Sequence, residues 1–194
     1  MNIVKRISEA IGQSIEVKQK ILADRELLDT VKDVADTCAQ ALCDGRKIMF
    51  CGNGGSAADA QHLAAELSGR FYIDRKPLAA EALTVNTSFL TAVANDYSFE
   101  EVFARLVTGS GNEGDVLVGL STSGNSENVI RAFQAAHQKG IITVGLTGES
   151  GGKMAALSDF LIRVPSADTP RIQESHILIG HIICELVEGS LFAK

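Results

Sequence analysis

The sequence predicts an α/β protein, a three-layer sandwich in which helices cover both faces of a five-stranded parallel sheet. From Lys47 onward, short apolar runs of β type alternate with helical stretches, and parallel strands need such crossover helices. The 194 residues suit one domain with one core. No linker, low-complexity tract or repeat interrupts the chain. We therefore predict a single domain over residues 1–194.

The first 45 residues predict two helices that are joined near Ala23 and Asp24. Their apolar positions recur at helical spacing, at Ile3, Ile7, Ile11, Ile15, Leu27, Val31, Val34, Cys38 and Leu42. The first helix is amphipathic, so it is able to pack either on a partner subunit or on its own domain. The sequence alone leaves both arrangements open.

Residues 46–194 predict the α/β core and a long C-terminal helix. The expected strands are residues 47–51, 79–85, 115–120, 142–147 and 160–164. The final helix is expected from about Arg171 to Phe192.

Composition narrows the classes of function and partner. The net charge of −6 comes without clusters of Lys and Arg, which argues against a nucleic-acid surface. No uninterrupted apolar stretch approaches the roughly 20 residues that cross a bilayer, so we expect no membrane partner. The four cysteines form no C-x-x-C pair, which is typical of a reducing compartment. We expect a cytoplasmic protein.

Two loops after predicted strands are the candidate binding elements. They read CGNGGSAADA (51–60) and LSTSGNSENV (120–129). Ligands of open parallel sheets collect at the carboxyl ends of the strands, and small residues before a helix N-terminus let backbone N–H groups approach an anion. The second loop adds hydroxyl donors and is the better phosphate site, with Ser121, Thr122, Ser123 and Ser126.

Each loop also has a simpler interpretation, as a tight connection whose serine caps a helix at about 1 kcal/mol. The occurrence of two such loops in one sheet favours a binding site. A third interpretation is a dinucleotide site, because Gly52, Gly54 and Ala57 fit the relaxed fingerprint. That site needs an acidic residue at the end of the next strand. The sequence has Val85, Asn86 and Thr87 there, so this interpretation ranks low.

His62 and Glu66 follow the first loop on one predicted helix. Their spacing of four residues places both side chains on one face, where they either share a metal ion or form an ordinary surface pair. Polar residues also interrupt the apolar C-terminal helix, at Gln173, His176 and His181, and buried polar groups need partners. His176 lies about 60° around the helix from Gln173 but about 140° from His181, so we expect it in another environment. His137 is interpreted as exposed, with no role.

At this point the chain resembles the phosphoheptose isomerase family, whose members consist of a sugar-isomerase (SIS) domain. The resemblance covers nearly the whole chain and rests on four stretches: CGNGGSAADAQHLAAELSGRF (51–71), NTSFLTAVANDYSFEEVFARLV (86–107), GDVLVGLSTSGNSENVIRAF (114–133) and VPSADTPRIQESHILIGHIICELVE (164–188). It implies a homotetramer with active sites at subunit boundaries. It also implies conversion of sedoheptulose 7-phosphate to D-glycero-D-manno-heptose 7-phosphate through an enediol, in lipopolysaccharide core-sugar biosynthesis.

The resemblance also implies roles for individual residues. Asn53, Gly54 and Gly55 would meet the sugar, the serine and threonine residues of loop 120–129 would hold the phosphate, and Asn95 and Asp96 match a further substrate-binding pair. The implied zinc ligands, for one ion per subunit, are His62, Glu66, Gln173 and His181. Ser56 matches a substrate-binding position, and Arg70 matches a motif position without an assigned role.

The expected catalytic residues are Glu66, as the base at carbon, and His181, as its acid/base partner. A related class of SIS proteins binds the replication initiator and lacks this acid/base set, so a non-catalytic module that binds a sugar phosphate or a protein is the alternative. His62, Glu66 and His181 are all present, which favours the enzyme.

Overall fold

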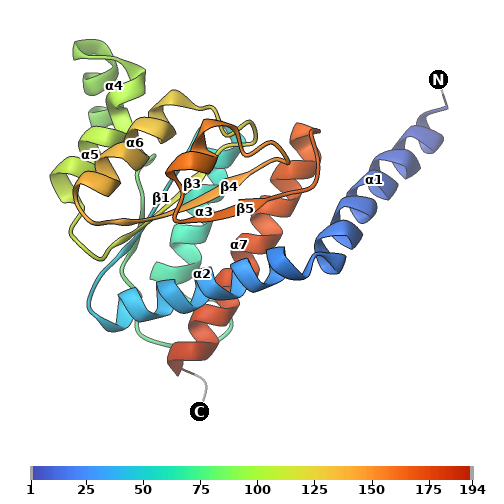
Figure 1. The fold of residues 1–194 in the computed structure, drawn as a ribbon, viewed down its shortest axis with the longest axis horizontal. Helices are drawn as coiled ribbons and strands as arrows, with labels where there is room; N and C mark the ends of the chain where they lie inside the picture. The colour runs from blue at the N-terminus through green and yellow to red at the C-terminus, as the bar shows by residue number, and fades with distance from the viewer. Residues whose placement is uncertain (1, 193–194) are drawn as a thin grey trace.

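The computed structural model of the protein describes residues 2–192, which contain a five-stranded parallel sheet in the order β2-β1-β3-β4-β5 (Figure 1). The strands are β1 (Ile48–Gly52), β2 (Ala80–Ala82), β3 (Val116–Leu120), β4 (Ile142–Thr147) and β5 (Phe160–Arg163). All five predicted strands exist. The second is shorter than the expected 79–85, because the chain turns at Leu83 and Thr84 to enter the next helix.

Helices cover both faces of the sheet, which confirms the predicted three-layer sandwich. One face carries α2 (Arg25–Cys43), α3 (Gly55–Ser68) and α7 (Thr169–Phe192). The other carries α4 (Thr87–Asp96), α5 (Val102–Ser110) and α6 (Glu127–Gln138), with the 3-10 turns η1 (Phe99–Glu101) and η2 (Gly152–Leu157). Each layer buries its own apolar cluster against the sheet, as parallel sheets require.

The two N-terminal helices meet where the sequence predicts. A single residue, Asp24, separates α1 (Ile3–Ala23) from α2. Asp24 caps α2 by accepting a hydrogen bond from the Leu27 N–H at 3.0 Å. The buried residues of α1 are Val17 and Ile21, near its end. Its N-terminal part stands apart from the body of the protein (Figure 1), with Ile7 and Ile11 54% and 57% exposed. The apolar stripe of α1 therefore faces away from its own domain.

Among the helices of residues 2–192, α7 alone is long and apolar enough to cross a membrane. A core helix of a soluble protein meets the same criterion. α7 buries Ile172, Ile179 and Val187 in the cluster that α2 and α3 share, and it also buries His176 and Glu188. We therefore interpret α7 as a core helix.

The strand order places a crevice between β1 and β3. From β1 the chain crosses to β2 on one side and then returns to β3 on the other side of β1. The connections after β1 and β3 thus leave in opposite directions at the carboxyl edge, where ligands bind in such sheets. Residues 53–54 and 121–126 lie in these two connections.

Candidate active site

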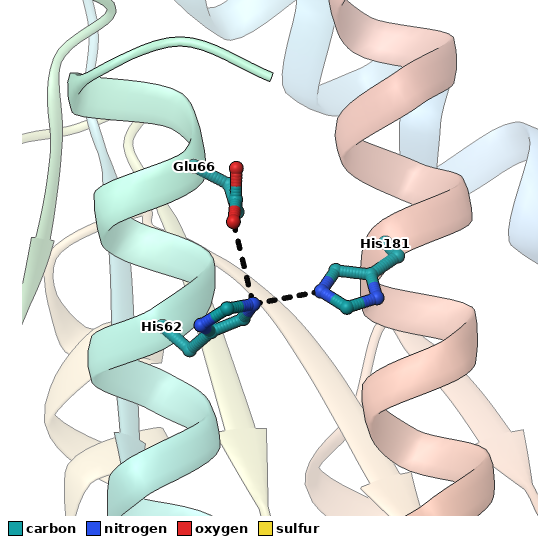
Figure 2. Close-up of side chains that lie close together, drawn as sticks. All are labelled: His62, Glu66 and His181. Carbon is teal, nitrogen blue, oxygen red and sulfur yellow. Dashed lines mark hydrogen bonds and ion pairs between the residues drawn. The ribbon is translucent and has the colours of Figure 1, made fainter. Parts of the chain in front are cut away.

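Three side chains from two helices converge beside the sheet. His62 and Glu66 come from α3, and His181 comes from α7 (Figure 2). The His62 Nε2 atom lies 2.8 Å from His181 Nε2 and 3.3 Å from Glu66 Oε1. One donor atom from each of the three lies within 4.8 Å of the others. The four-residue spacing thus places His62 and Glu66 on one face, as predicted, and that face points toward α7.

A glycine allows α3 and α7 to approach closely enough for this cluster. A Cβ atom on Gly180 would lie 2.6 Å from both Cδ atoms of Leu63, a distance that packed atoms do not adopt. His62 is the chain neighbour of Leu63, and His181 is the chain neighbour of Gly180. The close packing of Leu63 on Gly180 therefore brings the two histidines together.

The surroundings of the cluster are partly apolar and partly acidic. The Phe71 ring lies 5.8 Å from the His181 ring. Burial raises the pKa of Asp59, and the charges of His62 and His181 offset part of this rise. Burial, and to a lesser extent the Glu66 carboxylate, raises the pKa of Cys184 to about 12. The thiol beside the cluster therefore stays protonated.

The donor set fits a zinc ion. Two imidazole nitrogens and one carboxylate oxygen are ligands that zinc prefers, and catalytic zinc sites combine three such protein ligands with an open position. His62 is exposed, and Glu66 and His181 are half-buried, so the three side chains are accessible from solvent. The chemistry of these side chains, rather than their number, makes this a candidate metal centre.

The fourth expected ligand, Gln173, contacts the start of α3. The Gln173 amide is two helical turns before His181 on α7, beside Gly55, and its Nε2 group donates to Ser56 Oγ at 3.5 Å. The structure therefore places Gln173 at the first loop, and its role as a metal ligand stays a prediction. His176 is separate, as predicted: it is buried and its Nε2 group donates to the Thr147 carbonyl at 3.1 Å.

The second loop forms one wall of a cavity of about 270 Å³ at the carboxyl edge. Thr122 and Ser123 line it, opposite Ser166 and Thr169 at the start of α7. The remaining hydroxyls of the loop, Ser121 Oγ and Ser126 Oγ, lie 2.8 Å apart. The loop thus has the hydroxyl groups and helix N-terminus that a phosphate needs.

Gly124 in this loop serves a purpose that the sequence did not reveal. A Cβ atom here would lie 2.1 Å from the Gly151 carbonyl oxygen. Its φ angle of +66° also favours glycine. The close approach at Gly124 is therefore made by the β4–η2 connection.

Two expected site residues lie away from the cluster within one chain. Asn95 and Asp96 are exposed at the end of α4, which covers the opposite face of the sheet from α3 and α7 (Figure 1), and Asn95 Nδ2 donates to Asp96 Oδ1 at 2.9 Å. The single chain does not bring these two side chains to the His62 cluster. Arg70, which has no assigned role, is exposed in the segment after α3.

A larger hollow, of about 640 Å³, lies at the amino ends of the strands beside His137 and Asp159. His137 is exposed there, as predicted, with its Nε2 atom 3.2 Å from Thr143 Oγ1. Because ligands of open parallel sheets bind at the opposite edge, we place the candidate site at the carboxyl edge.

Sequence reasoning missed several residues that support the site. Asp59 lies one helical turn before His62. This spacing would have predicted that the two side chains are neighbours on the helix. Asn128 forms a hydrogen-bonded pair with Asn53. Arg75 and Glu188 form an ion pair at 2.8 Å with side chains 1% and 2% exposed, and Arg75 also donates to the Glu66 and Leu67 carbonyls at the end of α3. No local pattern marks these long-range pairs.

Comparison with known proteins identifies the family of this chain. Residues 11–148 match the model of the SIS domain. The phosphoheptose isomerase of Aneurinibacillus thermoaerophilus is 56% identical over 186 residues, which cover 96% of this chain and 94% of that protein. The chain belongs to the phosphoheptose isomerase family.

Solved structures of phosphoheptose isomerases agree in fold. The structure of phosphoheptose isomerase GmhA from Neisseria gonorrhoeae has a TM-score of 0.91 at 46% identity and covers 97% of this chain and 100% of its own. The enzyme from Francisella tularensis has a TM-score of 0.92 at 36% identity, covering 96% and 98%. The similarity to phosphoheptose isomerases therefore extends over the N-terminal helices and the α7 side of the site, beyond residues 11–148.

Proposed function

We propose that the protein is an aldose–ketose isomerase that converts sedoheptulose 7-phosphate to D-glycero-D-manno-heptose 7-phosphate. The observation that carries the proposal is the convergence of His62, Glu66 and His181 in a chain that belongs to the phosphoheptose isomerase family. A non-catalytic SIS module would not need this acid/base set.

The substrate divides between the two loops of the crevice. The phosphate binds at Ser121, Thr122, Ser123 and Ser126, at the N-terminus of α6. The sugar lies along Asn53, Gly54, Gly55 and Ser56, and the Gln173 amide beside Ser56 adds a hydrogen-bonding group. This arrangement directs the carbonyl end of the sugar toward the His62 cluster on α3.

The reaction moves a proton from C1 to C2 through an enediol, with a matching transfer of a proton from the C1 oxygen to the C2 oxygen. Glu66 removes the C1 proton and returns it at C2. His181 transfers the proton between the oxygens. When bound at His62, Glu66, His181 and Gln173, zinc supplies positive charge that stabilises the enediolate oxygens.

The assembly that we propose is a homotetramer with the apolar stripe of α1 buried between subunits. Ile3, Val4, Ile7, Ile11 and Ile15 are all more than half exposed on one chain, and such a stripe is typical of an interface. Asn95 and Asp96, which lie away from the cluster in one chain, would reach an active site at a subunit boundary. We place the enzyme in the cytoplasm, as one SIS domain that begins the synthesis of the lipopolysaccharide heptose.

Two substitutions test the enzyme directly. Glu66→Gln and His181→Ala should each lower turnover of sedoheptulose 7-phosphate by about 10²- to 10⁴-fold, with melting temperatures near that of the wild type. His137→Ala, at an exposed histidine outside the site, should keep full turnover. Wild-type protein that binds the sugar phosphate without converting it would instead support the non-catalytic module.

A further inference from the structure

Two asparagine side chains join the loops that face each other across the crevice between β1 and β3. Asn53 Nδ2 donates to Asn128 Oδ1 at 2.9 Å, and Asn128 Nδ2 donates to Asn53 Oδ1 at 2.8 Å. The residues are 75 positions apart in the sequence. Asn53 follows β1 directly, and Asn128 lies in the first turn of α6. The pair therefore connects the expected sugar-binding loop to the expected phosphate-binding helix.

The two members of the pair differ in their freedom to meet a ligand. Asn128 is 3% exposed, and a buried amide is costly to leave without partners. Asn53 is half-buried at the crevice. An amide side chain has two N–H groups and two acceptor lone pairs, and the pair uses one of each on Asn53. One donor and one acceptor of Asn53 thus remain for a ligand.

We propose that Asn128 is a positioning residue, which fixes the orientation of the Asn53 amide so that its remaining groups face the sugar. The inference rests on the proposed function in one respect, namely that the ligand of the first loop is a sugar phosphate. Asn128 itself makes no contact with the substrate in this account. Its effect on binding passes through Asn53.

The phosphate subsite does not depend on the pair. Ser121 and Ser126 are held together by their own hydroxyl groups at 2.8 Å. The loop also closes through the Gly124 N–H, which donates to the Ser121 carbonyl at 3.0 Å. Loss of the Asn128 amide should therefore affect the sugar end of the ligand and leave phosphate binding in place.

A double-mutant cycle tests the proposal through binding to metal-free protein, where turnover does not interfere. The dissociation constants of sedoheptulose 7-phosphate and of inorganic phosphate are measured by calorimetry for the wild type, Asn53→Ala, Asn128→Ala and the double variant. Each single variant should bind the sugar phosphate about tenfold more weakly, the effect of one oriented hydrogen bond. The double variant should bind no more weakly than Asn53→Ala alone. Phosphate binding should change less than twofold.

A control variant and a replacement variant accompany the double-mutant cycle. The control is Thr108→Ala on α5, where the Thr108 hydroxyl donates to the Ala104 carbonyl. It should change neither dissociation constant, whether it is made in the wild type or in Asn128→Ala. If Asn128→Ala fails to fold, Asn128→Leu replaces it, because that side chain has a similar size, carries no charge and is unable to donate to Asn53 Oδ1. Two independent, additive losses would overturn the proposal, as would an equal loss of phosphate binding.

The same data separate this inference from the proposed function. Sugar phosphate bound with the expected cycle but never converted by zinc-loaded wild type would remove the isomerase and leave the role of Asn128 standing. Wild type that fails to bind the sugar phosphate would overturn both.

Discussion

His62 and His181 face each other from α3 and α7, with their Nε2 atoms 2.8 Å apart although 119 positions separate them in the sequence. The rings meet edge to face, with centroids 5.0 Å apart. Two imidazoles and a carboxylate in this arrangement are able to transfer protons, and the same side chains are able to bind a metal once the shared proton has left. The proposed function depends on this one contact between helices.

The contact depends on Gly180, which gives the first prediction. Gly180→Ala would place a methyl group against Leu63, separate α3 from α7, and lower stability by about 1–3 kcal/mol. Zinc content and turnover should fall with it. The matched control is Gly189→Ala on the same helix, where a Cβ atom meets no atom within 4 Å, so activity should persist. Equal activity of the two variants would show that the spacing of the helices does not set the site.

The buried His176 predicts an acid-sensitive fold. Burial lowers its pKa from 6.5 to about 4, although the hydrogen bond to the Thr147 carbonyl opposes the shift. Between these two values the unfolded chain binds a proton that the folded chain does not. The free energy of unfolding should therefore be fully retained above about pH 6.5 and fall by about 3 kcal/mol toward pH 4.

The variant His176→Gln isolates this effect in denaturant titrations at pH 7 and pH 4.5. Glutamine keeps an N–H donor for the Thr147 carbonyl but does not titrate. The difference between the two pH values should shrink in the variant. An unchanged difference would assign the acid sensitivity to other groups.

The exposed stripe of α1 predicts that one charge breaks the assembly. Ile11→Glu would place a carboxylate in an apolar subunit interface, which is costly without a partner. Light scattering should show smaller species than for the wild type. Gln13→Glu adds the same charge to the other side of α1 and should leave the mass unchanged. A wild type that is already monomeric would refute the proposed tetramer.

Local pattern was sufficient to predict the layers but not the spacing between them. Asp24, as a helix cap between two apolar periodic stretches, marked the junction of α1 and α2. The spacing of His62 and Glu66 fixed their common face, because a helix repeats every 3.6 residues. In contrast, the packing of Leu63 on Gly180 is a contact between distant segments, which no periodicity reveals. The same holds for the Asn53–Asn128 pair and for Gly124 against Gly151.

Resemblance to the family supplied what neither pattern nor geometry contains. It suggested Gln173 as a zinc ligand, a role that stays a prediction beside the hydrogen bond of its amide to Ser56. It also suggested Asn95 and Asp96, which stand on the far face of the sheet in one chain. Neither spacing nor burial predicts Asn95 and Asp96 as site residues, because their function would require a neighbouring subunit.

The most direct test of the central claim follows the isomerisation of sedoheptulose 7-phosphate by NMR in deuterated water, before chelation, after chelation and after zinc is restored. Aldose product with deuterium at C2 is expected, because the proton that Glu66 takes from C1 exchanges with the deuterated solvent before Glu66 delivers a deuteron to C2. Product formation should stop on chelation and return with zinc. Folded, zinc-loaded protein that forms no product would contradict the assignment of His62, Glu66 and His181 as an isomerase site.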